Sequence, residues 1–104
     1  MGALVVFTTF PDRESAESIL KTLVEERLSA CAQIAGEIKS FYWWEGKLEE
    51  GKEFLAILKT TEEKYPELER RLVELHPYEV PEVVAVPSAF VYRPYLNWLE
   101  KELG

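Results

Sequence analysis

The sequence predicts an α+β fold, in which a layer of helices covers an antiparallel sheet. Runs of β-branched and apolar residues alternate with amphipathic segments, and a Glu-Gly pair separates two long strand-like segments. Hydrophobic residues make up 47% of the chain and charged residues 30%, a composition typical of soluble globular proteins. The 104 residues are enough for one domain, 1–104, with its own core.

The first strand and helix are clearly marked. Residues 3–9 are mostly apolar and β-branched, which predicts a central strand covered by helices on at least one face. Asp12 is a suitable N-cap for the helix that follows. Apolar residues then recur at spacings of three and four, which predicts an amphipathic helix ending near Leu28.

The middle of the chain predicts a long hairpin. Strand character runs from 30 to 44 and again from 47 to 59, and Glu45-Gly46 predicts a tight turn between them. Gly51 predicts a bulge in the second arm. Residues 54–58 are apolar at every position, so this part should be central in the sheet.

A second helix and a short strand follow the hairpin. We expect a turn at 61–64 and a helix from Tyr65, which Pro77 ends because the residue before a proline resists helical geometry. Residues 83–86 predict a buried strand that stops at Pro87.

The last segments complete the order of elements. Residues 88–91 predict a short edge strand, and Arg93-Pro94 begins a C-terminal helix with proline in its first turn. The order strand, helix, strand, strand, helix, strand is the ferredoxin-like arrangement, with the first and third strands central. The C-terminal helix is an addition to it.

The hairpin arms are longer than the helical layer. Arms of 13 to 15 residues span roughly 43–50 Å, whereas the first helix covers only about 24 Å. The overhanging part carries four successive aromatic residues, Phe41, Tyr42, Trp43 and Trp44. We therefore predict that another subunit covers them; the alternative is that two of the four face the domain's own core.

Charge and cysteine content restrict the function classes. The net charge of −7, with 19 acidic and 12 basic residues, argues against nucleic acid as the partner. No apolar run approaches the ~20 residues of a membrane span. Cys31 is the single cysteine and cannot form an internal disulfide, so we expect a cytoplasmic protein.

Residues 76–82 concentrate the reactive side chains. They hold the only histidine, His76, together with Tyr78, Glu79 and Glu82. These groups could bind a cation, transfer a proton, or stabilise the connection between the second helix and the next strand through hydrogen bonds. The carbonyl groups at the end of the preceding helix favour a protonated imidazole. Cys31 and His76 should lie at opposite ends of the sheet, so a metal shared between them would need two subunits.

Catalytic motifs are missing from the sequence. It has neither a glycine-rich phosphate loop nor a nucleophile elbow. Arg13 lies near the end of the first strand, but Phe10-Pro11-Asp12 offers no phosphate cradle of the acylphosphatase kind. We therefore predict a protein that is not an enzyme.

Taken together, several motifs resemble the CutA family of divalent-cation tolerance proteins. The motifs occur in the family's order along the whole chain: Glu26-Arg27-Leu28-Ser29-Ala30-Cys31, Tyr42-Trp43-Trp44-Glu45-Gly46-Lys47, Leu58-Lys59-Thr60-Thr61, His76-Pro77-Tyr78-Glu79-Val80-Pro81-Glu82 and Tyr95-Leu96-Asn97-Trp98-Leu99.

The resemblance implies a ferredoxin-like protomer in a homotrimer similar to PII signalling proteins, with a role in copper and divalent-metal tolerance. The family's proposed copper ligands match Thr8, Leu75 and His76, of which only His76 can ligate a metal. We therefore predict weak binding of Cu(II) or another divalent cation, with His76 and Glu82 as candidate ligands.

The PII-like architecture also implies an alternative function. In this reading the protein is a regulatory module that binds a small anion or nucleotide between subunits. Lys59, Tyr78 and Arg93 are the candidate ligand-binding residues.

Overall fold

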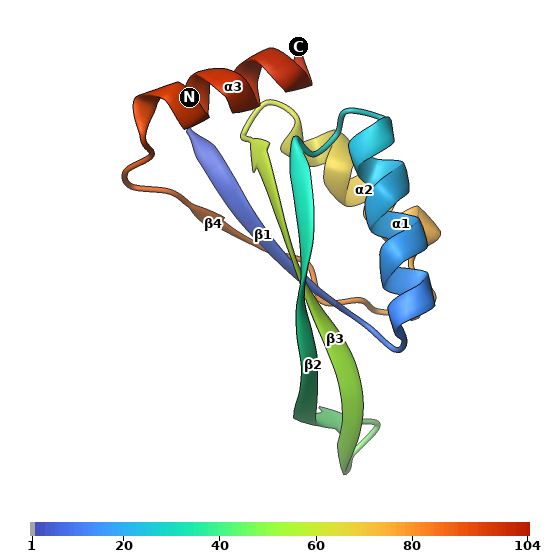
Figure 1. Cartoon of the computed structure of the whole chain (residues 1–104). Helices are drawn as coiled ribbons and strands as arrows, with labels where there is room; N and C mark the ends of the chain where they lie inside the picture. Colours follow the sequence, from blue (N-terminus) through green and yellow to red (C-terminus); the bar gives the residue numbers. More distant parts are fainter. Residues whose placement is uncertain (1) are drawn as a thin grey trace.

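A computed structural model describes residues 2–104 and confirms the ferredoxin-like α+β fold (Figure 1). Its four strands form one antiparallel sheet in the order β2-β3-β1-β4, so the first and third strands are central, as predicted. Within residues 2–104 no helix is long and apolar enough to cross a bilayer. The elements are β1 (Ala3–Phe10), α1 (Arg13–Glu25), β2 (Cys31–Trp44), β3 (Lys47–Thr61), α2 (Tyr65–Leu75), β4 (Val84–Pro87) and α3 (Arg93–Leu103).

The main core lies between the sheet and helices α1 and α2, which cover the same face of it (Figure 1). Alternate residues of the central strands point into this core, and Val6 and Leu58 are completely buried. Leu23 of α1 and Leu68 of α2 meet them from the helical layer and are also completely buried.

The opposite face of the sheet is covered only at one end. Helix α3 packs there through Leu99 and Leu103 against Ala3. Beyond it, Val84 and Val86 of β4 are 49% and 45% exposed. The prediction of a buried strand at 83–86 is therefore wrong for the protomer, because β4 is a sheet edge and one of its faces is uncovered.

Helix α1 ends earlier than Leu28, because its C-terminus forms a Schellman motif. The Arg27 N–H donates to Val24 O at 3.0 Å and the Leu28 N–H donates to Leu23 O at 3.1 Å. Arg27 adopts a left-handed conformation with φ of 58°. The usual glycine signal is absent at this position, which explains why periodicity alone places the end too late.

The hairpin turn is confirmed, but the bulge lies in the other arm. Glu45 and Gly46 have φ of 49° and 78°, as a two-residue hairpin turn requires. Gly51 pairs regularly with Ser40, so the predicted bulge there is wrong. The register shifts instead between Ile34 and Gly36, whose φ of 143° is readily adopted only by glycine.

The hairpin extends well beyond α1 and α2, as predicted (Figure 1). The protomer measures 44 × 26 × 23 Å, and the hairpin accounts for its elongation. The four aromatic side chains on the overhang are all exposed, so the alternative that two of them face the core is wrong. Their exposed fractions are 63% for Phe41, 46% for Tyr42, 73% for Trp43 and 42% for Trp44.

Residues 88–91 do not form the predicted edge strand in the protomer. The Ser88 N–H donates to Ala3 O at 3.0 Å, but pairing between β1 and β4 ends at Leu4 and Pro87. The chain then crosses to α3 with Phe90 95% exposed and Tyr92 78% exposed.

Candidate functional site

A groove lies between the hairpin overhang and the loop that follows α2. Its volume is about 980 Å³, and aromatic and acidic side chains dominate its walls. Two segments that are distant in the sequence therefore form one surface. The groove is lined by Thr9, Ser40, Phe41, Tyr42, Trp43, Trp44, Glu49, Glu53, Pro77, Tyr78, Glu79, Val80, Pro81 and Glu82.

His76 lies at the base of the loop and is buried rather than presented to the groove. It caps α2 in an extended conformation, because Pro77 disfavours a further helical residue. Its side chain is only 7% exposed and its ring stacks on Phe10 with centroids 4.8 Å apart. The imidazole thus belongs to the core at this end of the sheet.

Both ring nitrogens of His76 are hydrogen bonded. The Tyr78 N–H can only donate, so Nδ1 accepts this bond at 3.1 Å. The proton of the neutral ring is therefore on Nε2, which donates to Thr9 O at 2.8 Å. Burial lowers the pKa of His76. The expectation of a protonated imidazole is thus wrong, because the desolvation that lowers the pKa of His76 outweighs the opposing effects of Thr9 O and the Glu53 carboxylate.

Tyr78 fastens the loop to the hairpin. Its hydroxyl donates to Glu53 Oε2 at 2.8 Å. Burial and the Glu53 carboxylate both raise the pKa of Tyr78, so the phenol keeps its proton at neutral pH. This contact joins the loop to β3, and both residues line the groove.

The predicted metal ligands do not form a ready site. Glu82 is exposed in the groove wall, but His76 offers no free lone pair while the turn to Tyr78 is intact. Within residues 2–104 no three His, Cys, Asp or Glu side chains are grouped as metal ligands would be. In this conformation the residues do not fit a bound metal ion. A metal can reach the His76 imidazole only if a hydrogen bond opens.

Cys31 lies at the other end of the sheet, as predicted. It pairs across the strands with Lys59, and its Sγ is 3.4 Å from the Tyr95 hydroxyl. His76 bonds to Thr9, whose strand partner is Leu55. Lys59 and Leu55 are four residues apart, about 13 Å along the strand, so Cys31 and His76 cannot share a metal within one protomer.

The candidate anion-binding residues are also dispersed. Lys59 Nζ donates to Gln33 Oε1 at 2.6 Å, near Cys31. Tyr78 contacts Glu53, six residues along β3 from Lys59 and about 20 Å away. Arg93 is exposed at the start of α3. A regulatory site that uses all three would need several subunits, and it stays a prediction.

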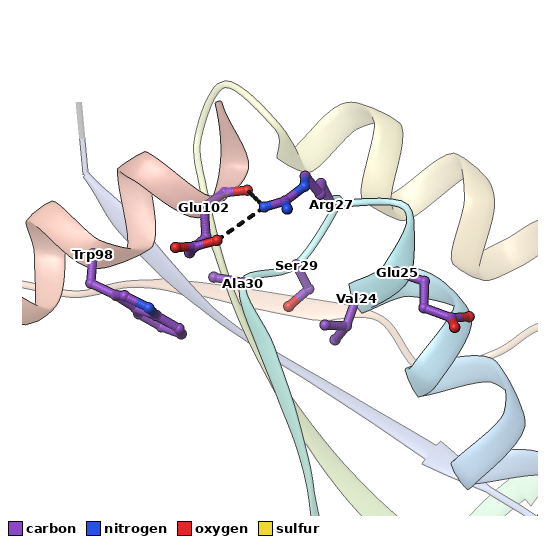
Figure 2. A pocket seen from close by; sticks show the side chains of 7 residues that line it. All are labelled: Val24, Glu25, Arg27, Ser29, Ala30, Trp98 and Glu102. Atoms are coloured by element: carbon purple, nitrogen blue, oxygen red, sulfur yellow. Dashed lines mark hydrogen bonds and ion pairs between the residues drawn. The ribbon is translucent and has the colours of Figure 1, made fainter.

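A second, smaller cavity of about 450 Å³ lies between the end of α1 and helix α3 (Figure 2). Arg27 crosses it, and its guanidinium donates to Glu102 O at 2.8 Å and to Glu102 Oε1 at 3.0 Å. Trp98 forms another wall. Because Arg27 is already paired, an anion would have to displace Glu102. Sequence reasoning missed this cavity, since no local pattern brings positions 27 and 102 together.

Comparison with known proteins identifies close relatives along nearly the whole chain. A family model described as CutA1 divalent ion tolerance protein matches residues 4–102. The divalent-cation tolerance protein CutA of Pyrococcus horikoshii is 54% identical over 99 residues, which cover 95% of this chain and 96% of that protein.

Solved structures agree at the level of the fold. The divalent cation tolerance protein Cut A1 of Thermus thermophilus matches with a TM-score of 0.94 and 46% identity, over 98% of this chain and 99% of that one. A CutA structure from Archaeoglobus fulgidus, described as a periplasmic divalent cation tolerance protein, has a TM-score of 0.94 and 37% identity. It covers 98% of this chain and 99% of its own.

Proposed function

This chain belongs to the CutA1 divalent ion tolerance protein family, and from that membership we propose that it is a non-catalytic homotrimer that acts in divalent-cation tolerance and binds copper or another divalent cation weakly. The match over residues 4–102 is the observation that carries the proposal. The relatives from Pyrococcus and Thermus carry the same functional name.

Exposed apolar surface in the protomer supports the assembly. The overhang presents its four aromatic side chains to solvent, and β4 presents Val84 and Val86 on the uncovered face of the sheet. Surfaces of this kind on a soluble chain mark sites of association. We expect sedimentation equilibrium to give about three times the 12.1 kDa protomer mass. A stable monomer at micromolar concentration would contradict the homotrimer.

The metal part of the proposal uses Glu82 and His76. Glu82 is accessible in the groove, which also contains Glu49 and Glu79. His76 must first release the Tyr78 N–H, which costs about 0.5–1.5 kcal/mol and lowers the affinity accordingly. The proposed site is therefore weak and depends on opening of the turn.

Calorimetric titration with Cu(II) tests this proposal. We expect a dissociation constant of about 1 μM or weaker for the intact protein, weakened further in His76→Ala and in Glu82→Ala. Glu100→Ala, which removes an exposed carboxylate on α3, is the matched control and should bind like the wild type. Tight binding that neither His76→Ala nor Glu82→Ala changes would rule out these two ligands.

We also propose a cytoplasmic location. The single cysteine of the sequence gives no intrachain disulfide that an oxidising compartment would favour. The Archaeoglobus relative, in contrast, is described as periplasmic. Fractionation of the source cells should recover the protein with cytosolic markers, and recovery outside the cytosol would refute this location.

A further inference from the structure

The cavity between α1 and α3 has the features of a small-molecule site. Its volume of about 450 Å³ falls within the range of ligand pockets, roughly 300–1,000 Å³. Arg27 and Glu102 border it on one side and Trp98 on another (Figure 2). It shares no lining residue with the groove, the overhang or β4. The cavity is therefore separate from the surfaces proposed for metal binding and for assembly.

The backbone of Arg27 indicates that its side chain has a role beyond the ion pair. With φ of 58° the residue occupies the left-handed position of the Schellman motif, which glycine adopts at the least cost. Strained positions of this kind cluster at functional sites. The side chain is 63% exposed, so its pairing with Glu102 contributes little to stability and does not by itself explain an arginine here.

The ion pair that crosses the cavity can be exchanged. The Glu102 carboxylate takes one hydrogen bond from the guanidinium, which Nη1 donates at 3.0 Å. A carboxylate that meets an edge of the planar guanidinium forms two parallel hydrogen bonds and is held more firmly. The Glu102 side chain is 37% exposed, so it has room to turn aside. An incoming carboxylate can therefore replace that of Glu102 on Arg27.

The charges that line the cavity favour a zwitterion over an anion. The lining contains one guanidinium, that of Arg27, and two carboxylates, those of Glu25 and Glu102. An anion alone adds a third negative charge and leaves the displaced Glu102 carboxylate without a partner. A zwitterion also carries an ammonium group, which pairs with the carboxylate that it displaces. In a free α-amino acid both charged groups are attached to one carbon, so a single molecule replaces both halves of the Arg27–Glu102 pair.

An apolar wall is available for the side chain of such a ligand. Trp98 is 40% exposed, and its ring lies against that of Tyr95 with centroids 5.5 Å apart, which restricts the indole. Val24 and Ala30 also line the cavity. An apolar group that packs on this wall is removed from water, which favours binding. The wall thus suits an aromatic or a branched aliphatic side chain.

We propose that the cavity between α1 and α3 binds a free α-amino acid with an apolar side chain. The carboxylate of the amino acid pairs with Arg27, its ammonium group pairs with the Glu102 carboxylate, and its side chain packs on Trp98. The ligand then connects the end of α1 to α3 in place of the direct ion pair. This binding activity is additional to the proposed role in divalent-cation tolerance and uses none of its candidate ligands.

Calorimetric titration with L-phenylalanine tests the class of ligand. We expect a dissociation constant of about 1 mM or tighter. Phenethylamine lacks the carboxylate and 3-phenylpropionate lacks the ammonium group, so each leaves one member of the Arg27–Glu102 pair without a partner. Each should bind at least about tenfold more weakly than L-phenylalanine. Absence of L-phenylalanine binding at about 10 mM, or equally tight binding of either analogue, overturns the proposal.

Three variants test the location of the site. Arg27→Gly removes the guanidinium but relieves the backbone, so it should stay folded and bind L-phenylalanine at least about tenfold more weakly. Glu102→Gln should weaken the binding of L-phenylalanine but not that of 3-phenylpropionate, which has no ammonium group. Arg70→Ala is the matched control, because Arg70 is 64% exposed and pairs with Glu74, and it should bind like the wild type.

A spectroscopic readout at Trp98 completes the test. Its indole N–H resonance, assigned by its absence from Trp98→Phe, should shift when L-phenylalanine is added to the wild type and stay in place in Arg27→Gly. Circular dichroism checks that each variant is folded. Binding that Arg27→Gly and Glu102→Gln leave unchanged would overturn the site, whereas loss in both variants and retention in Arg70→Ala supports it.

Discussion

His76 joins three parts of the protein with one buried ring. His76 is the C-cap of α2, and its ring contacts β1 by donating to Thr9 O and by stacking on Phe10. The same ring accepts a hydrogen bond from the N–H of Tyr78 in the loop. A neutral imidazole with both nitrogens satisfied is a stable arrangement in a core. The residue that looked most reactive in the sequence therefore has a clear structural role.

Removing the ring should destabilise the fold. We expect His76→Ala to lower the free energy of unfolding by about 2–4 kcal/mol, because it leaves a cavity beside Phe10 and two backbone groups without partners. Chemical denaturation at a fixed protein concentration measures the change. An effect below about 0.5 kcal/mol would mean that the ring contributes little to the core.

The protonation of His76 should also make stability depend on pH. Its pKa in the folded protein lies below the ordinary value of 6.5, because burial disfavours the charged ring. The unfolded chain therefore binds the proton first, so stability is full above 6.5 and falls as the pH drops through the folded pKa. His76→Phe keeps a ring on Phe10 but does not titrate, so its unfolding free energy should lack this decrease.

The sequence predicted which residues matter at this corner but not how they are arranged. Pro77 allowed the end of α2 to be predicted, because the steric effect of proline acts on its immediate neighbour. The protonation of His76 was predicted wrongly, since its contacts with Thr9 and Phe10 come from a strand 66 or more residues earlier. Effects between neighbouring residues, such as that of Pro77, can be predicted from the sequence, whereas the burial of a side chain depends on the fold.

At the scale of elements, the end of α1 depends on a left-handed residue that is not glycine. Arg27 has φ of 58°, and a side chain there costs about 1 kcal/mol relative to glycine. The side chain of Arg27 is 63% exposed and that of Glu102 is 37% exposed, so their ion pair contributes little to the stability of the fold. Backbone strain and a surface ion pair are thus combined in one residue.

Two substitutions at this position separate the strain from the ion pair. Arg27→Ala and Arg27→Gly both remove the contact with Glu102, but only the glycine relieves the backbone. We expect Arg27→Gly to exceed Arg27→Ala in free energy of unfolding by about 1 kcal/mol. Denaturation under identical conditions measures the difference, and equal stabilities would contradict a strained cap.

The hairpin and residues 88–91 show the limit of prediction from strand propensity. Both were predicted as strands, but only the hairpin supplies its own partner through the Glu45-Gly46 turn. Residues 88–91 have the composition of a strand, but within residues 2–104 their contact with β1 is limited to the bond from the Ser88 N–H to Ala3 O, and they form no strand. Composition indicates which backbone conformation a segment favours, whereas pairing into a sheet requires a second strand close enough to form hydrogen bonds.

At the scale of the whole molecule, the sheet has one closed face and one largely open face. Helices α1 and α2 cover the first, and α3 covers only one end of the second. The open part contains Val84 and Val86 of β4. This strand is apolar at every position although it is half-exposed in the protomer. An entirely apolar composition is typical of a strand that is buried on both faces, which β4 would become if another subunit covered the open face.

Two valines of nearly equal exposure allow this interpretation to be tested. Val86 on the open face is 45% exposed and Val73 on the outer side of α2 is 46% exposed, so exposure in the protomer does not distinguish them. If subunits meet through the open face, Val86→Asp buries an unpaired carboxylate in the assembly and should shift it to monomers. Val73→Asp stays in water and should leave the mass unchanged. Sedimentation of both variants at micromolar concentration decides between the faces, because loss of assembly in Val73→Asp but not in Val86→Asp would place the subunit contact on the helical layer instead.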